Sequence, residues 1–217
     1  MSHDHIIARE GWGYILFFLV LTGIAYYFEY TVAAVLLLMI CLFIVFFFRN
    51  PARKPVDDEF AVIAPADGRV LSIERVIEDR HLKGESIKIS IFLSLFNVHI
   101  NRLPIQATVD WTLREGYSFL PAYKAEASDT NVRNYLALSS AFGRLLVVQI
   151  TGLVARRLVC WVNAGDKLPA GARFGLIKFG SCTEIYVPGD TTILVDAGQR
   201  VRGGETVIGR FDNQKMC

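Results

Sequence analysis

Two long apolar runs near the N-terminus constrain this chain more than any other feature of its sequence. Residues 11–27 and 31–48 contain no Asp, Glu, Lys or Arg, and only three residues separate them. The hydrocarbon core of a bilayer is about 30 Å thick and needs roughly 20 helical residues, so each run is just long enough to cross or nearly cross it. We predict that residues 1–50 form an α-helical membrane hairpin, which either spans the bilayer or enters one leaflet and returns.

Basic residues follow directly after the second run, at Arg49, Arg53 and Lys54. Because the cytoplasmic flanks of membrane segments are enriched in Lys and Arg, we predict that the following domain lies on the cytoplasmic side of the cell membrane. A cleavable signal peptide is a competing interpretation, since Arg9 precedes the first run. That run lacks a small-x-small cleavage site before the second run, however, and a signal peptide needs no second apolar segment.

Charge and cysteine content argue against several other classes of protein. The formal net charge of +2 is too small to favour a nucleic-acid partner, and there is no long basic run. The cysteines show no CxxC spacing, which predicts reduced thiols and neither a disulfide framework nor a metal site. They are Cys41, Cys160, Cys182 and Cys217.

Residues 51–217 are predicted to form a mostly β domain. Alternating or β-branched runs bounded by turn residues predict strands at residues 61–64, 68–73, 86–92, 105–109, 144–150, 158–162 and 192–195. The turn-rich segments 65–70 and 195–209 resemble the hairpins of the barrel-sandwich hybrid seen in biotinyl and lipoyl carrier domains. We therefore predict a flattened barrel of this hybrid type. The more polar segment 116–140 is predicted to be a functional loop on the substrate side.

The single Gly-Ser dipeptide of the chain, Gly180-Ser181, has a specific chemical potential. A serine hydroxyl can attack the carbonyl of a preceding glycine, because glycine has backbone freedom and no side chain that blocks the approach. The attack needs a nearby base. Only His81 and His99 follow the hairpin, and an imidazole with a pKa near ~6.5 accepts and donates protons at neutral pH. His99 stands in an Asn-Val-His-Ile-Asn-Arg motif, and Asp67 stands in an earlier Pro-Ala-Asp-Gly turn.

These motifs, in this order and behind a membrane hairpin, resemble the short form of the phosphatidylserine decarboxylase family, from residue 48 to the C-terminal hairpin. The resemblance implies a self-processing lyase, cut between Gly180 and Ser181, in which Ser181 becomes a covalent pyruvoyl cofactor. It implies that phosphatidylserine in the membrane forms a Schiff base with this group and leaves as phosphatidylethanolamine and carbon dioxide. The cleaved α and β chains are expected to remain a heterodimer, with a higher homo-oligomer as a further option.

Within this interpretation, single residues receive roles. His99 is the expected proton carrier, and Asp67 is expected to orient it or stabilise its charge, in a triad with Ser181. Arg102 and Arg133 are expected to bind the lipid phosphate or the substrate carboxylate, with solvated surface charges as the alternative. The long form of the family has two histidines in the middle motif, whereas this chain has His99 alone. One imidazole is therefore expected to serve both self-cleavage and decarboxylation.

Two other functions are compatible with parts of the sequence. A membrane-anchored carrier or adaptor domain without catalysis would explain the hairpins of hybrid type, but a carrier needs a lysine at the hairpin tip, and neither segment offers one. A pyruvoyl enzyme acting on a soluble amino acid is a third option. The membrane hairpin argues against it, because a soluble substrate gives no reason for docking on lipid.

Overall fold

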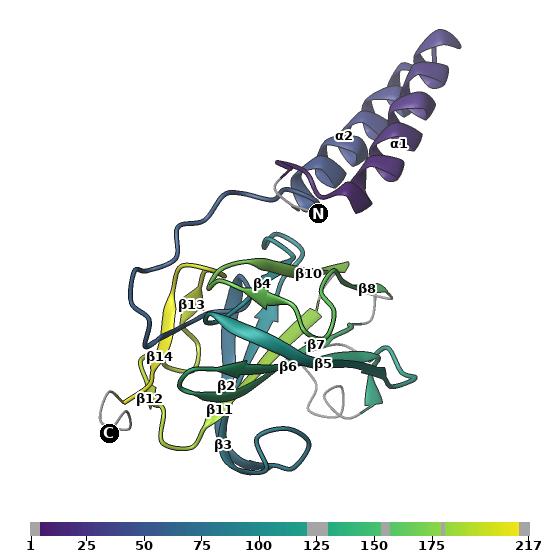
Figure 1. The fold of residues 1–217 in the computed structure, drawn as a ribbon. Coiled ribbons are helices and arrows are strands. Elements are labelled where there is room, and N and C mark those ends of the chain that lie inside the picture. Colours follow the sequence, from purple (N-terminus) through teal and green to yellow (C-terminus); the bar gives the residue numbers. More distant parts are fainter. Residues whose placement is uncertain (1–4, 121–129, 153–156, 179–180, 213–217) are drawn as a thin grey trace. The chain divides into compact units, whose positions relative to one another are not determined.

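The structure, a computed structural model, divides into two compact units, Met1–Ala52 and Arg53–Cys217 (Figure 1). It describes four stretches of the chain, residues 5–120, 130–152, 157–178 and 181–212. The first unit is helical and the second is built from strands. This confirms the prediction of a mostly β chain with two N-terminal helices.

The first unit is a pair of apolar helices, α1 (Arg9–Tyr27) and α2 (Thr31–Phe47), which lie side by side (Figure 1). Length and composition allow α1 to cross a membrane, and α2 is a shorter apolar helix of 17 residues. Apolar side chains on both helices are exposed, with Leu16 at 63% and Leu36 at 60%. Exposed apolar surface of this kind marks contact with a membrane or a partner, so the hairpin is consistent with membrane association.

The second unit consists of short strands that follow one another closely. In chain order they are β1 (Ala61–Ile63), β2 (Gly68–Glu78), β3 (Gly84–Leu93), β4 (Ile100–Arg102), β5 (Ala107–Glu115), β6 (Arg133–Ser140), β7 (Gly143–Ile150), β8 (Arg157–Cys160), β9 (Lys167–Leu168), β10 (Arg173–Lys178), β11 (Ser181–Pro188), β12 (Thr192–Ile193), β13 (Arg200–Val201) and β14 (Val207–Arg210).

These strands form one large and two small sheets. The large sheet has eight strands in the order β13-β2-β3-β11-β7-β6-β5-β9, and the small sheets have the orders β1-β14-β12 and β4-β10-β8. Within the described residues, every pairing between these strands is antiparallel. The consecutive strands β10 and β11 belong to different sheets, so the chain passes from one sheet to the other between residues 178 and 181.

The middle strands of the large sheet are buried on both faces. Ile185 of β11 packs into the main core, whereas Cys182 of the same strand packs into a second cluster on the opposite face. β6 shows the same division, with Leu136 in the main core and Ala137 in the second cluster. Strands buried on both faces have nearly continuous apolar sequences, so the period-two alternation of a half-buried strand is absent from them.

Continuous burial explains one wrong prediction. The segment 116–140 was expected to be a loop, but its last part is β6 (Arg133–Ser140), paired with β5 and β7. Apolar and small residues succeed one another in β6 without alternation, because both of its faces are covered. Residues 121–129, at the centre of the predicted loop, lie outside the described part of the chain.

The two turn-rich segments of the sequence meet in space. β13 pairs with β2, which sets Val201 opposite Gly68 and Arg200 opposite Arg69. The backbone N–H of Gly204 also donates to the carbonyl of Ala64 at 2.9 Å. The C-terminal hairpin is thereby fixed against the first strands of the unit.

Gly68 allows the closest backbone approach in this region, which leads to a stability prediction. A Cβ atom at Gly68 would lie 2.3 Å from the carbonyl oxygen of Phe92, whereas one at Gly84 would meet nothing within 4 Å. We expect Gly68→Ala to lower the free energy of unfolding by about 1–3 kcal/mol, as overpacking does. The matched variant Gly84→Ala should leave it nearly unchanged. Thermal unfolding in detergent micelles measures both, and equal midpoints would contradict the close approach.

Candidate active site

The strand pairings join the segments that carry the predicted nucleophile and the predicted base to the consecutive strands β11 and β10. Ser181 is the first residue of β11 and pairs with Leu93, the last residue of β3. The chain then runs through residues 94–99 into β4, which pairs with β10, and the N–H of Ile177 donates to the carbonyl of His99 at 3.1 Å. Residues 94–99 therefore connect the partner strand of β11 to the partner strand of β10. His99 lies beside Ile177, near the end of β10, whereas Gly180, which precedes the predicted cut, lies outside the described residues.

Ser181 is held in an unusual environment for a hydroxyl group. The residue is fully buried, and its Oγ has no hydrogen-bond partner among the residues that the structure describes. A buried hydroxyl without a partner costs free energy, so its presence in a strand needs a reason such as a catalytic role. Cys182 points to the opposite face, where burial and the charge of Glu184 raise the pKa of its thiol. The thiol of Cys182 is therefore not the reactive group on the side of Ser181.

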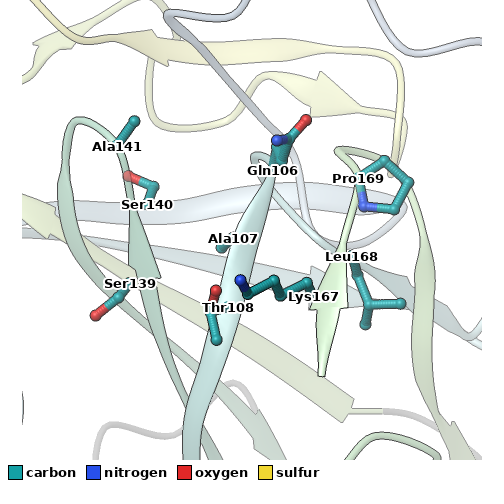
Figure 2. Close-up of a pocket in the computed structure, with 9 residues that line it drawn as sticks. All are labelled: Gln106, Ala107, Thr108, Ser139, Ser140, Ala141, Lys167, Leu168 and Pro169. Carbon is teal, nitrogen blue, oxygen red and sulfur yellow. The ribbon is translucent and has the colours of Figure 1, made fainter. Parts of the chain in front are cut away.

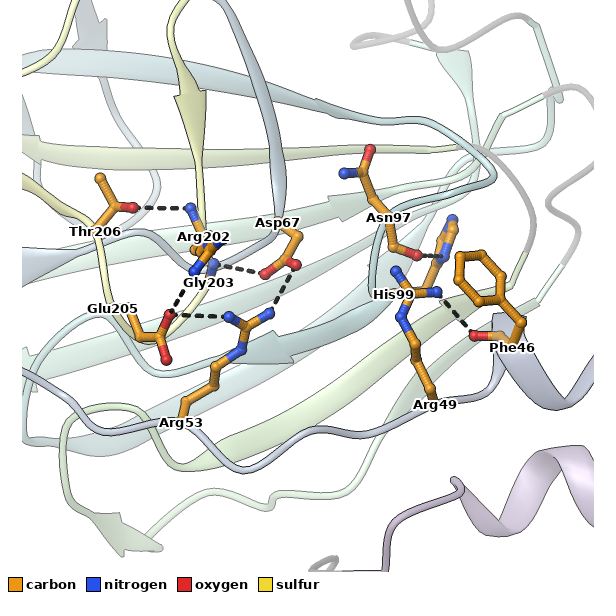
Figure 3. Close-up of polar contacts among 10 residues, drawn as sticks. All are labelled: Phe46, Arg49, Arg53, Asp67, Asn97, His99, Arg202, Gly203, Glu205 and Thr206. Atoms are coloured by element: carbon orange, nitrogen blue, oxygen red, sulfur yellow. Dashed lines mark hydrogen bonds and ion pairs between the residues drawn. The ribbon is translucent and has the colours of Figure 1, made fainter.

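His99 is fully buried, and its ring is fixed by a backbone contact. Its Nδ1 lies 2.9 Å from the carbonyl oxygen of Asn97 (Figure 3). A carbonyl oxygen only accepts hydrogen bonds, so Nδ1 carries the proton in the neutral ring. Nε2 is then the nitrogen that can accept a proton, which is the state that a general base needs.

Asp67 is tied to the linker and to the C-terminal hairpin. Its Oδ2 accepts a hydrogen bond from Arg53 at 2.9 Å, and its Oδ1 accepts one from the N–H of Gly203 at 2.8 Å (Figure 3). Arg53 also binds Glu205 at 2.9 Å. Each carboxylate oxygen of Asp67 thus already has a partner other than His99, and the predicted role of Asp67 toward that ring stays a prediction.

Comparison with known proteins decides which chemistry this arrangement belongs to. The family model described as phosphatidylserine decarboxylase matches residues 40–209. The phosphatidylserine decarboxylase proenzyme of Carboxydothermus hydrogenoformans is 48% identical over 212 residues, covering 97% of this chain and 99% of that protein. The proenzyme of Symbiobacterium thermophilum is 44% identical over 207 residues, covering 95% of this chain and 96% of that protein. The chain belongs to the phosphatidylserine decarboxylase family.

Phosphatidylserine decarboxylase proenzymes carry a pyruvoyl group derived from a serine. Ser181 fits such a precursor, because its hydroxyl is buried at the first residue of a strand and has no hydrogen-bond partner among the described residues. The residue is also shielded from water, as a reactive carbonyl requires if side reactions are to be avoided.

In this member of the decarboxylase family, the two predicted substrate-binding residues, Arg102 and Arg133, each contact another residue of the protein. Arg102 is only 4% exposed, and its Nη1 donates to the carbonyl of Gly171 at 3.0 Å. Burial, helped by the charges of Arg173 and Arg53, lowers the pKa of Arg102 to about 10. Nη2 of Arg133 lies 3.5 Å from Oε1 of Glu115. Their predicted role in substrate binding stays a prediction.

Sequence reasoning missed a buried chain of polar side chains beside the candidate site. Asn101 donates to the hydroxyl of Thr183 at 3.0 Å, and Gln149 donates to the side-chain oxygen of Asn101 at 2.8 Å. Asn134 in turn donates to Gln149 at 3.0 Å. Asn101 lies in β4, which directly follows His99, and Thr183 lies in β11, which begins at Ser181. The hydrogen bond between Asn101 and Thr183 therefore links these two strands. One feature of the sequence could have indicated these hydrogen bonds, a single Gln within the apolar run of β7.

A cavity elsewhere in the unit carries none of this chemistry. It has a volume of about 350 Å³ and lies between β5, β9 and the turn after β6 (Figure 2). Lys167 is the one charged residue in its lining, and no predicted site residue lines it. We therefore assign the candidate active site from strand register and buried polar groups, and this cavity is not part of it.

The polar chain leads to a prediction about processing of the proenzyme. Thr183→Val removes the hydroxyl that accepts from Asn101 at nearly constant volume. We expect slower self-cleavage, by about tenfold, because a buried N–H that loses its partner costs about 1–3 kcal/mol and the two strands lose their link. Cys182→Ala is the matched control, since this side chain faces the other cluster and should leave the rate unchanged. Gel analysis of cleavage over time measures both, and equal rates would argue against a positioning role.

Proposed function

We propose that this chain is a phosphatidylserine decarboxylase that cuts itself between Gly180 and Ser181. Membership of the decarboxylase family over nearly the whole chain is the observation that carries the function. The assignment to Ser181 rests on its buried hydroxyl, which has no partner in the described part of the chain, and on its place in the single Gly-Ser dipeptide. Family membership favours this enzyme over the non-catalytic carrier domain.

In the proposed self-cleavage, the hydroxyl of Ser181 attacks the carbonyl carbon of Gly180. The peptide C–N bond breaks, an ester bond to Oγ forms, and the nitrogen of Ser181 becomes a free amine. Removal of the α-proton of residue 181 then expels the ester oxygen and frees the upstream chain. Nε2 of His99 suits the proton transfers, because Nδ1 is fixed as the donor to Asn97. Hydrolysis of the resulting enamine releases ammonia and leaves the pyruvoyl carbonyl.

During turnover, the pyruvoyl group supplies an electron sink for the electron pair released with carbon dioxide. The protein supplies the proton that replaces the carboxylate on the substrate carbon, and His99 is the proposed source. Asp67 is the proposed charge partner of the imidazolium form, acting together with Arg53, which it binds at 2.9 Å. A group that both accepts and donates a proton typically accelerates such steps by about 10²- to 10⁴-fold.

The two chains produced by the cut are proposed to stay together. The C-terminal chain would carry β11 to β14, and β11 lies between β3 and β7 of the N-terminal chain. β13 and β14 pair with β2 and β1 in the same way. Separation would expose both faces of a central strand, so the α and β chains should remain a heterodimer without a covalent bond.

The membrane hairpin is proposed to hold the enzyme at the surface where its substrate resides. Residues 1–50 form the proposed anchor, and residues 51–217 the catalytic domain. The basic residues after α2, Arg49 and Arg53 among them, support a cytoplasmic position of that domain. The meeting of the two turn-rich segments through β2 and β13 supports the finer proposal of a barrel-sandwich-hybrid type of fold.

Replacement of the proposed nucleophile gives the most direct test. Ser181→Ala should remain a single chain, because alanine offers no hydroxyl for attack. The wild type should yield two chains, and the shorter one should begin at residue 181 with a ketone that reacts with hydroxylamine. Intact mass spectrometry reads both results. A wild-type preparation that decarboxylates phosphatidylserine while fully uncut would refute the proposal.

The proposed base is tested by two histidine variants. His99→Ala should leave mostly uncut precursor, and any matured fraction should turn over at least about a hundredfold more slowly. His81→Gln is the control, because His81 binds the carbonyl of Leu138 at 3.1 Å, near the opposite end of the sheet from Ser181. Asp67→Asn should also slow maturation, through loss of the negative charge. Normal processing and full turnover in His99→Ala would make His99 a structural residue.

A further inference from the structure

The β-rich unit contains another cavity, which is basic. Its volume is about 640 Å³, and three arginines contribute to its lining, Arg69, Arg200 and Arg202. Asp67 and Asn97 line it as well. We call it the arginine pocket. Its residues connect β2, β13 and the segment that leads to His99.

Strand pairing forces the arginines together. Arg200 of β13 stands directly opposite Arg69 of β2. Arg202 follows Arg200 by two residues and therefore points to the same side, whereas Val201 between them is buried in the main core. Like charges directly opposite each other in an antiparallel pair are destabilising. A pair of this kind is expected where a ligand supplies the missing negative charge.

The described residues neutralise these charges only in part. Within the described part of the chain, neither Arg69 nor Arg200 has a carboxylate within 4.0 Å, and Arg69 donates only to the carbonyl of Gly198 at 2.8 Å. The carboxylate of Asp67 is bound by Arg53 at 2.9 Å. Arg202 lies 4.0 Å from Glu205, which Arg53 also holds. The pocket therefore has an excess of positive charge.

Asn97 connects this pocket with the candidate base. Its Oδ1 accepts from the N–H of Ser94 at 2.9 Å and from the hydroxyl of Ser94 at 2.7 Å, which leaves the amide NH₂ as the end that can donate to a ligand. The backbone carbonyl of the same residue accepts from His99 (Figure 3). A ligand bound by the side chain of Asn97 would therefore contact the residue whose carbonyl holds the ring of His99.

We propose that the arginine pocket binds the phosphodiester group of the phosphatidylserine headgroup. Guanidinium groups form paired hydrogen bonds with phosphate oxygens, and the amide of Asn97 adds a neutral donor. The amine end of the same headgroup would then extend along Asn97 toward the segment that carries His99. This inference rests on the proposed function, and it places phosphate recognition at residues other than the buried Arg102.

The test uses glutamine variants of the matured full-length enzyme. Arg200→Gln and Arg69→Gln should each raise KM for short-chain phosphatidylserine by about tenfold or more, as expected for loss of a charged hydrogen bond. kcat at saturation and the rate of self-cleavage should stay near wild type, since cleavage needs no lipid. Arg75→Gln is the matched control, because Arg75 is also an exposed arginine on β2 that donates to one backbone carbonyl, that of Gly189. Unchanged KM in both pocket variants would overturn the proposal.

Binding to the uncut precursor separates this inference from the decarboxylase assignment. Full-length Ser181→Ala should bind short-chain phosphatidylserine in calorimetry, and Arg200→Gln in that background should weaken binding by about tenfold. Serine should not compete. Inorganic phosphate binding as tightly as the lipid would identify a general phosphate site and overturn the headgroup assignment. Arginine-dependent binding in a protein whose wild type fails to decarboxylate the lipid would support the pocket and reject the enzyme function.

Discussion

The pairing of β11 between β3 and β7 is the interaction on which the rest of this structure depends. It fixes Ser181 opposite Leu93, at the point where the chain enters the large sheet. The preceding strand, β10, belongs to another sheet, so the chain changes sheets directly before Ser181. Because Ser181 pairs with Leu93, its backbone is held at the end of β3. Residues 94–99 lead from this end of β3 to His99, which lies beside Ile177 of β10.

Burial gives this site its chemical character and also its energetic cost. The hydroxyl of Ser181 has no partner in the described chain, a defect that a stable sheet tolerates only because its neighbours are well satisfied. Asn101 and Gln149 belong to a series of buried hydrogen bonds that links β11, β7 and β6 of the large sheet to β4. Low local polarity strengthens each of these hydrogen bonds. The site is therefore rigid where proton transfer requires fixed distances.

Charge is distributed so that a substrate of mixed charge can be recognised. Arg53 binds both Asp67 and Glu205, and within the described part of the chain Arg69 and Arg200 of the arginine pocket have no carboxylate within 4.0 Å. Phosphatidylserine carries a phosphate, a carboxylate and an amine, so a positive pocket next to a buried reaction site suits its headgroup. In the proposed enzyme, the apolar hairpin supplies affinity for lipid in addition to this headgroup recognition.

Local patterns in the sequence determined the hairpin, the β character of residues 51–217 and the chemistry available at Ser181 and His99, because each depends on run length, alternation or residue type alone. Each of the seven predicted strands has a counterpart, in β1, β2, β3, β5, β7, β8 and β12. β6 and β11 were missed since a strand covered on both faces shows no alternation. The shorter strands β4, β9, β10, β13 and β14 were not predicted either. Only the tertiary structure decided which groups meet: His99 with β10, Asp67 with Arg53, and Arg69 with Arg200. These contacts join residues far apart in the chain, and strand register, which sets them, is fixed by packing of the whole sheet.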